Sequence, residues 1–136
     1  MRCPRRAWLP MAAVLLFSGV CAAVGLQWEE LPPLPDPEGV AGPFVGVHGD
    51  ALIVAGGANF PEPRWETQKV FHDRVHVLLR ETAGGKTAYR WVEGPPLARP
   101  LAYGACASTP RGVVCAGGND AGQVHADAFL VAWDAA

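Results

Sequence analysis

The sequence predicts an all-β protein built from a repeated unit of four antiparallel strands. Short apolar runs alternate with glycine, proline, asparagine and aspartate, and the chain holds 16 glycines and 13 prolines, a pattern typical of short strands joined by turns. After the N-terminal segment, no stretch places apolar residues at the i, i+3, i+4, i+7 spacing of an amphipathic helix. A set of motifs also recurs along the chain, which indicates a repeat architecture.

The N-terminal segment has the pattern of a secretory signal peptide. Three arginines lie within the first six residues, and an apolar run over residues 7–20 follows. This run is shorter than the ~20 apolar residues of a membrane-spanning helix and leads into small residues. We therefore predict that residues 1–23 are a signal peptide and that the mature protein is periplasmic or secreted. Lipid attachment at Cys21 is disfavoured, because the preceding residues match a lipidation motif poorly.

We expect the mature protein to begin near Val24 or Leu26, because the apolar run ends in the small residues that signal peptidases accept. N-terminal sequencing of the exported protein measures this directly. A product that retains Met1 would contradict the prediction.

Removal of residues 1–23 makes the chain acidic. The segment contains three of the 11 basic residues and none of the 13 acidic residues, so its removal leaves a net charge of −5. Such a domain is not built to bind nucleic acid or an anionic membrane. Only Cys106 and Cys115 remain of four cysteines, so the fold does not depend on a disulfide framework, although one bond is possible in an oxidising compartment.

Each repeat begins with two strands that end in a glycine pair. In the first copy, a strand over 44–47 turns at Gly49-Asp50 into a strand that ends at Gly56-Gly57. In the second copy, a strand over 105–108 turns at 110–112 into a strand that ends at Gly117-Gly118. The two glycine pairs are 61 residues apart. Glycine is expected there because the chain turns sharply and needs positive φ.

A third strand and a tryptophan-bearing fourth strand complete each unit. The third strands are predicted over 70–78 and 124–131, and the fourth strand carries Trp91. The segment around Trp28 resembles that around Trp91, and Trp133-Asp134 resembles the start of another copy. We expect this tryptophan to pack as an apolar wedge between neighbouring units.

Four antiparallel strands per repeat describe one blade of a kelch-type β-propeller. A kelch blade spans ~50 residues, so the longer period here indicates insertions, which we place at 61–67 and 82–87. The propeller region is predicted over 24–136, with repeats at about 28–91 and 92–136. Because propellers close with ~4 to 8 blades, two blades are part of a ring, and we expect either truncation, missing blades supplied separately, or self-association.

The motifs of the mature chain resemble those of the cyclically permuted mutarotases, a family similar to the bacterial N-acetylneuraminate epimerases. The resemblance extends from Trp28 to Asp134, with one departure at Ala98, where the family has proline. The motifs that carry it are Pro43-Phe44-Val45-Gly46-Val47, Gly56-Gly57-Ala58-Asn59-Phe60-Pro61, Lys69-Val70-Phe71-His72-Asp73, Arg99-Pro100-Leu101-Ala102-Tyr103-Gly104 and Gly117-Gly118-Asn119-Asp120.

The resemblance implies the N-terminal third of a six-bladed propeller that interconverts the α and β anomers of N-acetylneuraminate, a sugar acid, without cofactor or metal. This reaction needs one group to take the proton of the anomeric hydroxyl, another to protonate the ring oxygen, and a cation to hold the carboxylate. The glutamate that serves the epimerases as base has no match on this chain. We therefore expect the chain alone to be inactive, with its catalytic residues unassigned.

Three residues are predicted to contact substrate. Arg99 precedes the inner strand of the second blade, where its guanidinium could clamp a carboxylate, or instead tie one blade to the next. Asn59 follows a glycine pair, where it could bind the sugar or cap a turn, as Asn119 could in the second blade. Phe60 could support a sugar ring or pack on the blade. Lys69 and Trp65 lie on the first insertion and are candidates for the pocket rim.

His72 and Asp73, with His125 and Asp127 in the second copy, suggest a metal site or an acid–base pair. Because residues repeated in each blade serve the blade, we predict no metal and expect these aspartates to bond the turn after the glycine pair.

Two rival functions remain. One is a noncatalytic kelch module that binds carbohydrate or protein. The other is a galactose-oxidase-like fragment, which ranks last because Tyr89 and Tyr103 form no recognisable copper set with Cys106 or Cys115.

The two mature cysteines are predicted to be unbonded. A two-residue turn at 110–111 would place Cys106 opposite Cys115. However, Pro110 and Gly112 favour a type I turn followed by a glycine bulge, which would shift the register by one and send the thiols to opposite faces.

Overall fold

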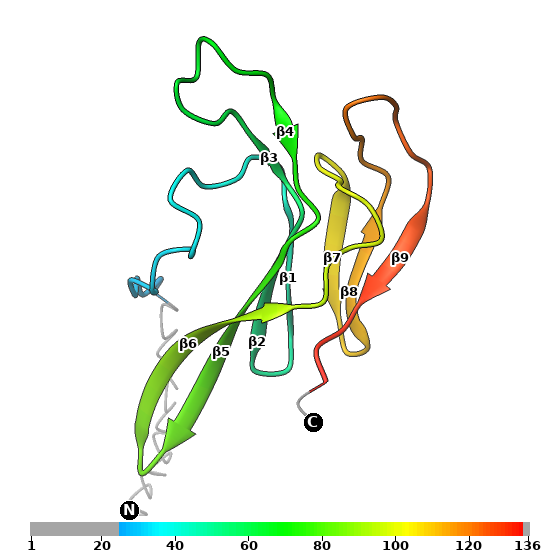
Figure 1. Cartoon of the computed structure of the whole chain (residues 1–136). Helices are drawn as coiled ribbons and strands as arrows, with labels where there is room; N and C mark the ends of the chain where they lie inside the picture. The colour runs from blue at the N-terminus through cyan, green and yellow to red at the C-terminus, as the bar shows by residue number, and fades with distance from the viewer. Residues whose placement is uncertain (1–24, 135–136) are drawn as a thin grey trace, which may run out of the picture.

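A computed structural model describes residues 25–134. The predicted signal peptide and its cleavage site at 23–24 lie outside these residues. Within 25–134 the structure is all-β (Figure 1). No helix in that range is long and apolar enough to cross a membrane.

The first blade is a four-stranded antiparallel sheet, as predicted. Its strands are β1 (Phe44–His48), β2 (Ala51–Ala55), β5 (Val75–Ala83) and β6 (Lys86–Gly94), in the order β1-β2-β5-β6. The predicted insertion at 82–87 does not form a loop. It lengthens the β5–β6 hairpin, which turns at Gly84-Gly85 where both residues have positive φ.

The predicted third strand over 70–78 is divided. Its start forms β4 (Val70–Phe71), which pairs with β3 (Ala58–Asn59), and the chain joins the blade only at Val75. The break lies opposite the glycine pair, whose residues both have positive φ: Gly56 N donates to the Arg74 carbonyl, and His72 N donates to the Gly57 carbonyl. The other predicted insertion, residues 61–67, is a loop between β3 and β4 (Figure 1).

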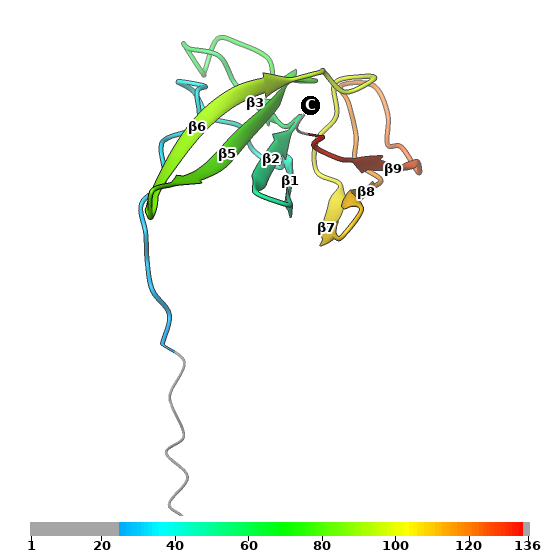
Figure 2. The ribbon, with the colours of Figure 1, turned by 90° about the horizontal axis from the view of Figure 1, so that it is seen from below.

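The second blade has three strands within the described residues: β7 (Ala105–Thr109), β8 (Gly112–Ala116) and β9 (Ala128–Val131). Trp133 follows β9 outside any strand. Figure 2 shows the two sheets as successive sectors, with β1 beside β7 and with β6 and β9 at opposite ends. The glycine pairs confirm the predicted backbone, because φ is 67° and 103° in the first pair and 68° and 102° in the second.

Of the three repeated tryptophans, Trp133 packs against the core between the blades as predicted, but Trp28 and Trp91 do not. Trp28 is 93% exposed. Trp91 lies on β6 next to Val92, which packs against the core, so its own side chain faces away from the second blade. There its Nε1 donates to the Pro32 carbonyl at 3.1 Å. Trp91 therefore fixes the N-terminal segment to the outer face of the first blade.

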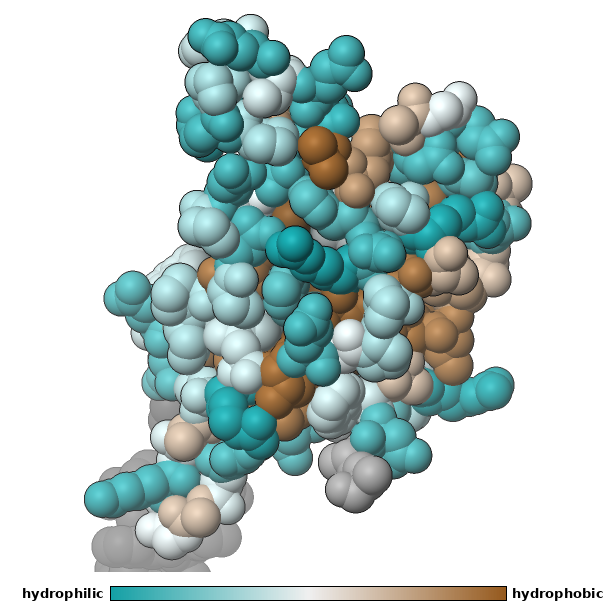
Figure 3. Space-filling model, in the orientation of Figure 1, coloured by the Kyte–Doolittle hydropathy of each residue, from teal (hydrophilic) through white to brown (hydrophobic). Residues whose placement is uncertain are grey.

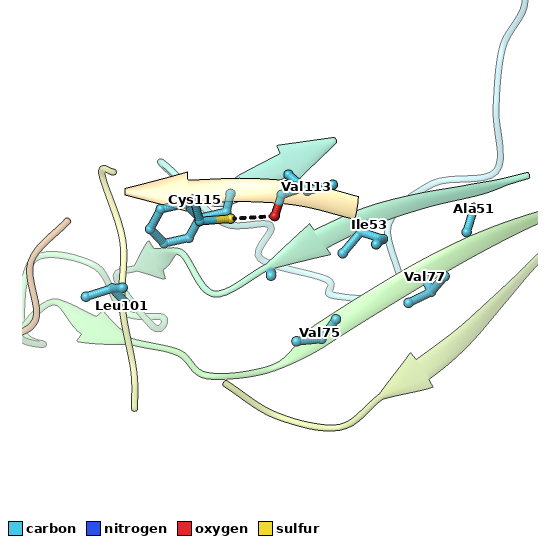
Figure 4. Packing of buried hydrophobic residues seen from close by; sticks show 9 residues of the cluster. Ala51, Ile53, Val75, Val77, Leu101, Val113 and Cys115 are labelled. Carbon is cyan, nitrogen blue, oxygen red and sulfur yellow. Dashed lines mark hydrogen bonds between the residues drawn. The ribbon is translucent and has the colours of Figure 1, made fainter. Parts of the chain in front are cut away.

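The core lies between the two blades (Figure 4). Phe44 is 1% exposed and meets Phe129 edge to face, with ring centroids 5.4 Å apart. Gly46 leaves room for the second blade, because a Cβ at this position would lie 2.6 Å from the Val113 side chain. Burial of this apolar surface is the main force that holds the blades together. The other buried members of the core are Ala51, Ile53, Ala55, Val75, Val77, Leu101, Val113 and Cys115.

Side chains of β7 cover the free edge of β1. Val45 N donates to Cys106 Sγ at 3.2 Å, and this thiol donates to the Val45 carbonyl at 3.1 Å. Val47 N donates to Ser108 Oγ at 2.8 Å. In each contact the two residues are 61 positions apart in the sequence, the same spacing as between the two glycine pairs. The edge that would otherwise be unpaired is thus satisfied from the equivalent strand of the next repeat.

The outer face of the second blade is apolar and open. Val114 and Leu130 are 42% and 45% exposed, and the neighbouring positions on this face are alanines. In Figure 3 apolar surface is visible on the side of the molecule formed by this blade.

The β7–β8 register differs from the one predicted. Thr109 pairs with Gly112 across a two-residue turn, and Cys106 pairs directly with Cys115. Both thiols are free, as predicted. The reason given for this was wrong, because no bulge shifts the register and the two cysteines share the face that meets the first blade.

Candidate functional site

A groove of about 380 Å³ lies where β3 and the 61–67 loop leave the first blade. We call it the upper groove. Two of the three predicted substrate residues, Asn59 and Phe60, line it, and Tyr103 of the second blade reaches into it. Its lining is completed by Glu38, Gly39, Val40, Ala41, Ala58 and Arg64.

Asn59 holds the walls of this groove together. Its Nδ2 donates to the Gly39 carbonyl at 3.0 Å, and its Oδ1 lies 2.8 Å from His72 Nε2. The amide thus joins the segment before β1 to β3 and β4. Both the nitrogen and the oxygen of the side-chain amide therefore have partners within the protein. This agrees with a structural role for Asn59, one of the two roles predicted for it, rather than with sugar binding.

Phe60 and Tyr103 line the groove, and Lys69 forms a cationic aromatic cluster with them. The Lys69 ammonium lies 5.0 Å from the centroid of the Tyr103 ring and 5.5 Å from that of Phe60. Both rings are partly open to solvent, at 45% and 43% exposure. Among residues 25–134, Lys69 makes no ion pair with a carboxylate. The ring faces attract this cation without neutralising it, so it is available to an anion.

Tyr103 has a backbone conformation that is rare for its residue type. Its φ is 62°, nearly the same as the φ of 61° at Gly42, the residue 61 positions earlier. The blades thus share a left-handed position, which is glycine in one and tyrosine in the other. For a residue with a side chain this costs about 1–2 kcal/mol. Such strain persists mainly at binding and catalytic sites.

The Tyr103 ring is held firmly despite this cost. It covers Gly42 so closely that a Cβ there would lie 2.3 Å from a ring carbon. Its edge meets Phe71, with centroids 6.3 Å apart. Tyr103 is not among the substrate-contacting residues predicted from the sequence. The signal that could have found it is the repeat itself, because aligning the copies at 61 residues sets tyrosine opposite glycine.

Arg99, the third predicted residue, lies elsewhere. It forms an ion pair with Asp127, and its Nη1 lies 3.1 Å from His125 Nδ1. It lines a separate cavity of about 170 Å³ next to Leu101 and Phe129. Its guanidinium thus ties the connection between the blades to the second blade, the structural alternative considered for it. Trp65, also considered for the rim, is 97% exposed and does not line the groove.

The repeated histidines serve the blades, but through different contacts from those predicted. His125 Nε2 lies 2.8 Å from Asp120 Oδ2, as His72 contacts Asn59. In each blade it is therefore the histidine, and not the aspartate of the third strand, that bonds the turn after the glycine pair. The residue equivalent to Asn59 is accordingly Asp120 and not Asn119.

Asp120 is the most perturbed carboxyl in the described part of the chain. The hydrogen bond with His125, followed by those from the Gly122 and Gln123 amides, lowers its pKa to about 2. It therefore remains ionised at neutral pH and accepts hydrogen bonds. Within residues 25–134, no three His, Cys, Asp or Glu side chains converge to hold a metal ion.

Comparisons with known proteins agree on one group of relatives. No protein-family model matches the chain. The N-acetylneuraminate epimerase of Brucella suis is 38% identical over 118 residues, which cover 79% of this chain and 30% of the relative. Those of Vibrio cholerae and Escherichia coli K12 are 33% and 32% identical over 117 and 111 residues.

A solved structure of YjhT, a kelch β-propeller, superimposes with a TM-score of 0.66 at 28% identity, over 82% of this chain and 33% of YjhT. The chain thus spans about a third of the length of the proteins it matches. The predicted fold class, part of a propeller of this type, is confirmed.

Proposed function

This chain is homologous to the N-acetylneuraminate epimerases over about a third of their length, and from that premise we propose that it supplies two blades of a propeller that binds a sugar acid such as N-acetylneuraminate. In the complete ring the reaction is the interconversion of the α and β anomers, without cofactor. The site of action is the periplasm or the cell exterior, in keeping with the N-terminal segment.

The observation that carries this proposal is the Lys69 ammonium, which contacts the partly exposed rings of Phe60 and Tyr103, two residues that line the upper groove. N-acetylneuraminate combines a carboxylate with a ring that has apolar C–H surfaces. The carboxylate suits the unneutralised cation, and the ring suits the faces of Phe60 and Tyr103. The groove volume of about 380 Å³ falls within the ~300–1,000 Å³ usual for small-ligand sites.

The two blades of this chain are proposed to bind the sugar acid, whereas catalysis needs further blades. Opening the sugar ring needs a base for the anomeric hydroxyl and an acid for the ring oxygen. A propeller's central pocket is built from several blades, and this chain contributes two. We therefore expect the chain to bind sugar acid without accelerating anomer exchange.

Replacing Lys69 tests the proposal. Lys69→Gln is expected to weaken binding of N-acetylneuraminate at least tenfold, because a hydrogen bond to a charged group contributes about 1.5–3 kcal/mol. Saturation-transfer NMR of the sugar, titrated against the purified chain, measures the affinity. Lys86→Gln on the β5–β6 hairpin removes the only other lysine and is expected to leave binding unchanged.

The methyl ester of the sugar separates the contact from a general loss of folding. The ester lacks the carboxylate charge, so the parent and Lys69→Gln should bind it equally weakly. Equal affinity of both proteins for the free acid would contradict a role for Lys69.

A further inference from the structure

The paired cysteines of the second blade are the feature that the proposed function leaves unused. Cys106 on β7 and Cys115 on β8 face each other directly, on the side of the sheet that meets the first blade. Residue 106 is exposed, whereas Cys115 is 0% exposed. One cysteine of the pair is therefore exposed, and the other is buried.

The position of the pair on the ladder suits a disulfide. Thr109 and Gly112 flank a two-residue turn and so form a hydrogen-bonded pair. Such pairs alternate with non-hydrogen-bonded ones along an antiparallel ladder, which makes Cys106 and Cys115 a non-hydrogen-bonded pair. Opposed Cα atoms are then about 4.5 Å apart, within the ~4.4–6.8 Å range that disulfides span. A bond between these two positions is therefore compatible with the geometry of the ladder.

In the reduced state each thiol has another partner. Cys106 Sγ accepts a hydrogen bond from Val45 N at 3.2 Å and donates one to the Val45 carbonyl at 3.1 Å. Cys115 Sγ donates to the Val113 carbonyl at 3.7 Å (Figure 4). Bonding the two sulfurs therefore requires rotation of the side chains, and it withdraws Cys106 from β1 of the first blade.

We propose that Cys106 and Cys115 are a redox-modification site, which forms a cross-strand disulfide with small disulfide oxidants and thereby releases the Val45 edge of the first blade. The Cys106 thiolate attacks one sulfur of the oxidant R–S–S–R, whose S–S bond breaks, and RS⁻ leaves. Cys115 then loses its proton and attacks Cys106 Sγ, which displaces a second RS⁻. The two protons from the cysteines convert the leaving groups to two RSH, and two electrons pass from the cysteines to the oxidant.

The order of these steps follows from the environments of the two sulfurs. Burial, with a smaller effect of the neighbouring Cys106, raises the pKa of the Cys115 thiol to about 11. A thiol in this state is a poor first nucleophile. Once Cys106 carries the mixed disulfide, the attack of Cys115 is intramolecular and its low thiolate fraction is offset by proximity.

The test uses the full chain treated with oxidised glutathione under native conditions, then denatured with an alkylating reagent and digested with trypsin. Cleavage after Arg111 separates the two cysteines, so that their disulfide joins two peptides, distinct from any product of Cys3 or Cys21. The joined pair of peptides is the expected result. Two separately alkylated peptides, or Cys106 and Cys115 bonded only between chains, would overturn the proposal.

Two serine variants test the order of attack. Cys115→Ser is expected to retain one glutathione on Cys106, because nothing resolves the mixed disulfide. Cys106→Ser, whose hydroxyl can still bond Val45, is expected to leave Cys115 unmodified in the folded chain. Rapid glutathionylation of Cys115 in Cys106→Ser, with its amide protection matching the parent, would show that Cys115 reacts independently and contradict the proposed order.

Amide exchange measures the effect on the blade contact. Oxidation removes the sulfur that accepts from Val45 N, so the exchange rate of that amide should rise about fivefold for the loss of one hydrogen bond of ordinary strength. Val47 N donates to Ser108 Oγ instead and serves as the internal control. Unchanged exchange at Val45 in the oxidised chain would contradict release of the edge.

Discussion

Gly56→Ala is expected to lower the free energy of unfolding by about 2–5 kcal/mol. Gly56 has φ 67°, where an L-residue loses about 1–2 kcal/mol. An added Cβ would also lie 2.2 Å from the Leu101 carbonyl oxygen. That oxygen belongs to the backbone and already accepts a hydrogen bond from Gly57 N at 2.9 Å, so it has little freedom to move. Overpacking of this kind costs about 1–3 kcal/mol more.

Urea denaturation followed by tryptophan fluorescence measures this loss, and Gly84→Ala is the matched control. Gly84 has φ 58°, but no atom lies within 4 Å of an added Cβ. Its substitution is therefore expected to lower the free energy of unfolding only by the penalty of a left-handed backbone, about 1–2 kcal/mol. Equal losses at the two glycines would show that the contact with Leu101, and hence the close approach of the connecting segment, is not present in solution.

Phe44→Ala is expected to cost about 3–5 kcal/mol, the range found for deletion of a buried aromatic side chain. Phe44 is 1% exposed and contacts Phe129 of the second blade. The cavity left by its ring cannot close easily, because Gly104 and Gly118, which have no side chains, form part of its walls. Domains of ordinary size have a net stability of only about 5–15 kcal/mol, so this variant should be largely unfolded in moderate urea.

The same deletion at Phe60, which is 43% exposed, is the control and should cost less than about 1 kcal/mol. A loss at Phe44 no larger than that at Phe60 would contradict a core shared between the blades. Selective destabilisation of blade-one amides in hydrogen exchange, with blade two unchanged, would likewise show that the blades fold independently.

Part of the candidate site was accessible to sequence reasoning. Asn59 and Phe60 follow a glycine pair, and the turn that the pair imposes fixes where they emerge. Lys69 was considered for the rim because of its place near the first insertion, and in the structure it contacts the Phe60 and Tyr103 rings. Arg99 pairs with Asp127, which is 28 residues away, and this pairing has no local signature. The repeat sets Tyr103 opposite Gly42, but its left-handed backbone and its place in the groove are visible only in the folded chain.

The sequence by itself determined the strand pairs of each blade, the glycine pairs and the all-β class, because turns and alternating strands depend on interactions between residues near each other in the chain. Only the tertiary structure decided the β7–β8 register, the face that Trp91 covers and the residues that share the upper groove. These features depend on the packing of one blade against the other. Examples are the contact of Gly46 with Val113 and the Tyr103 ring over Gly42. Such contacts form across about 60 residues, where steric fit and buried apolar area outweigh local turn preference.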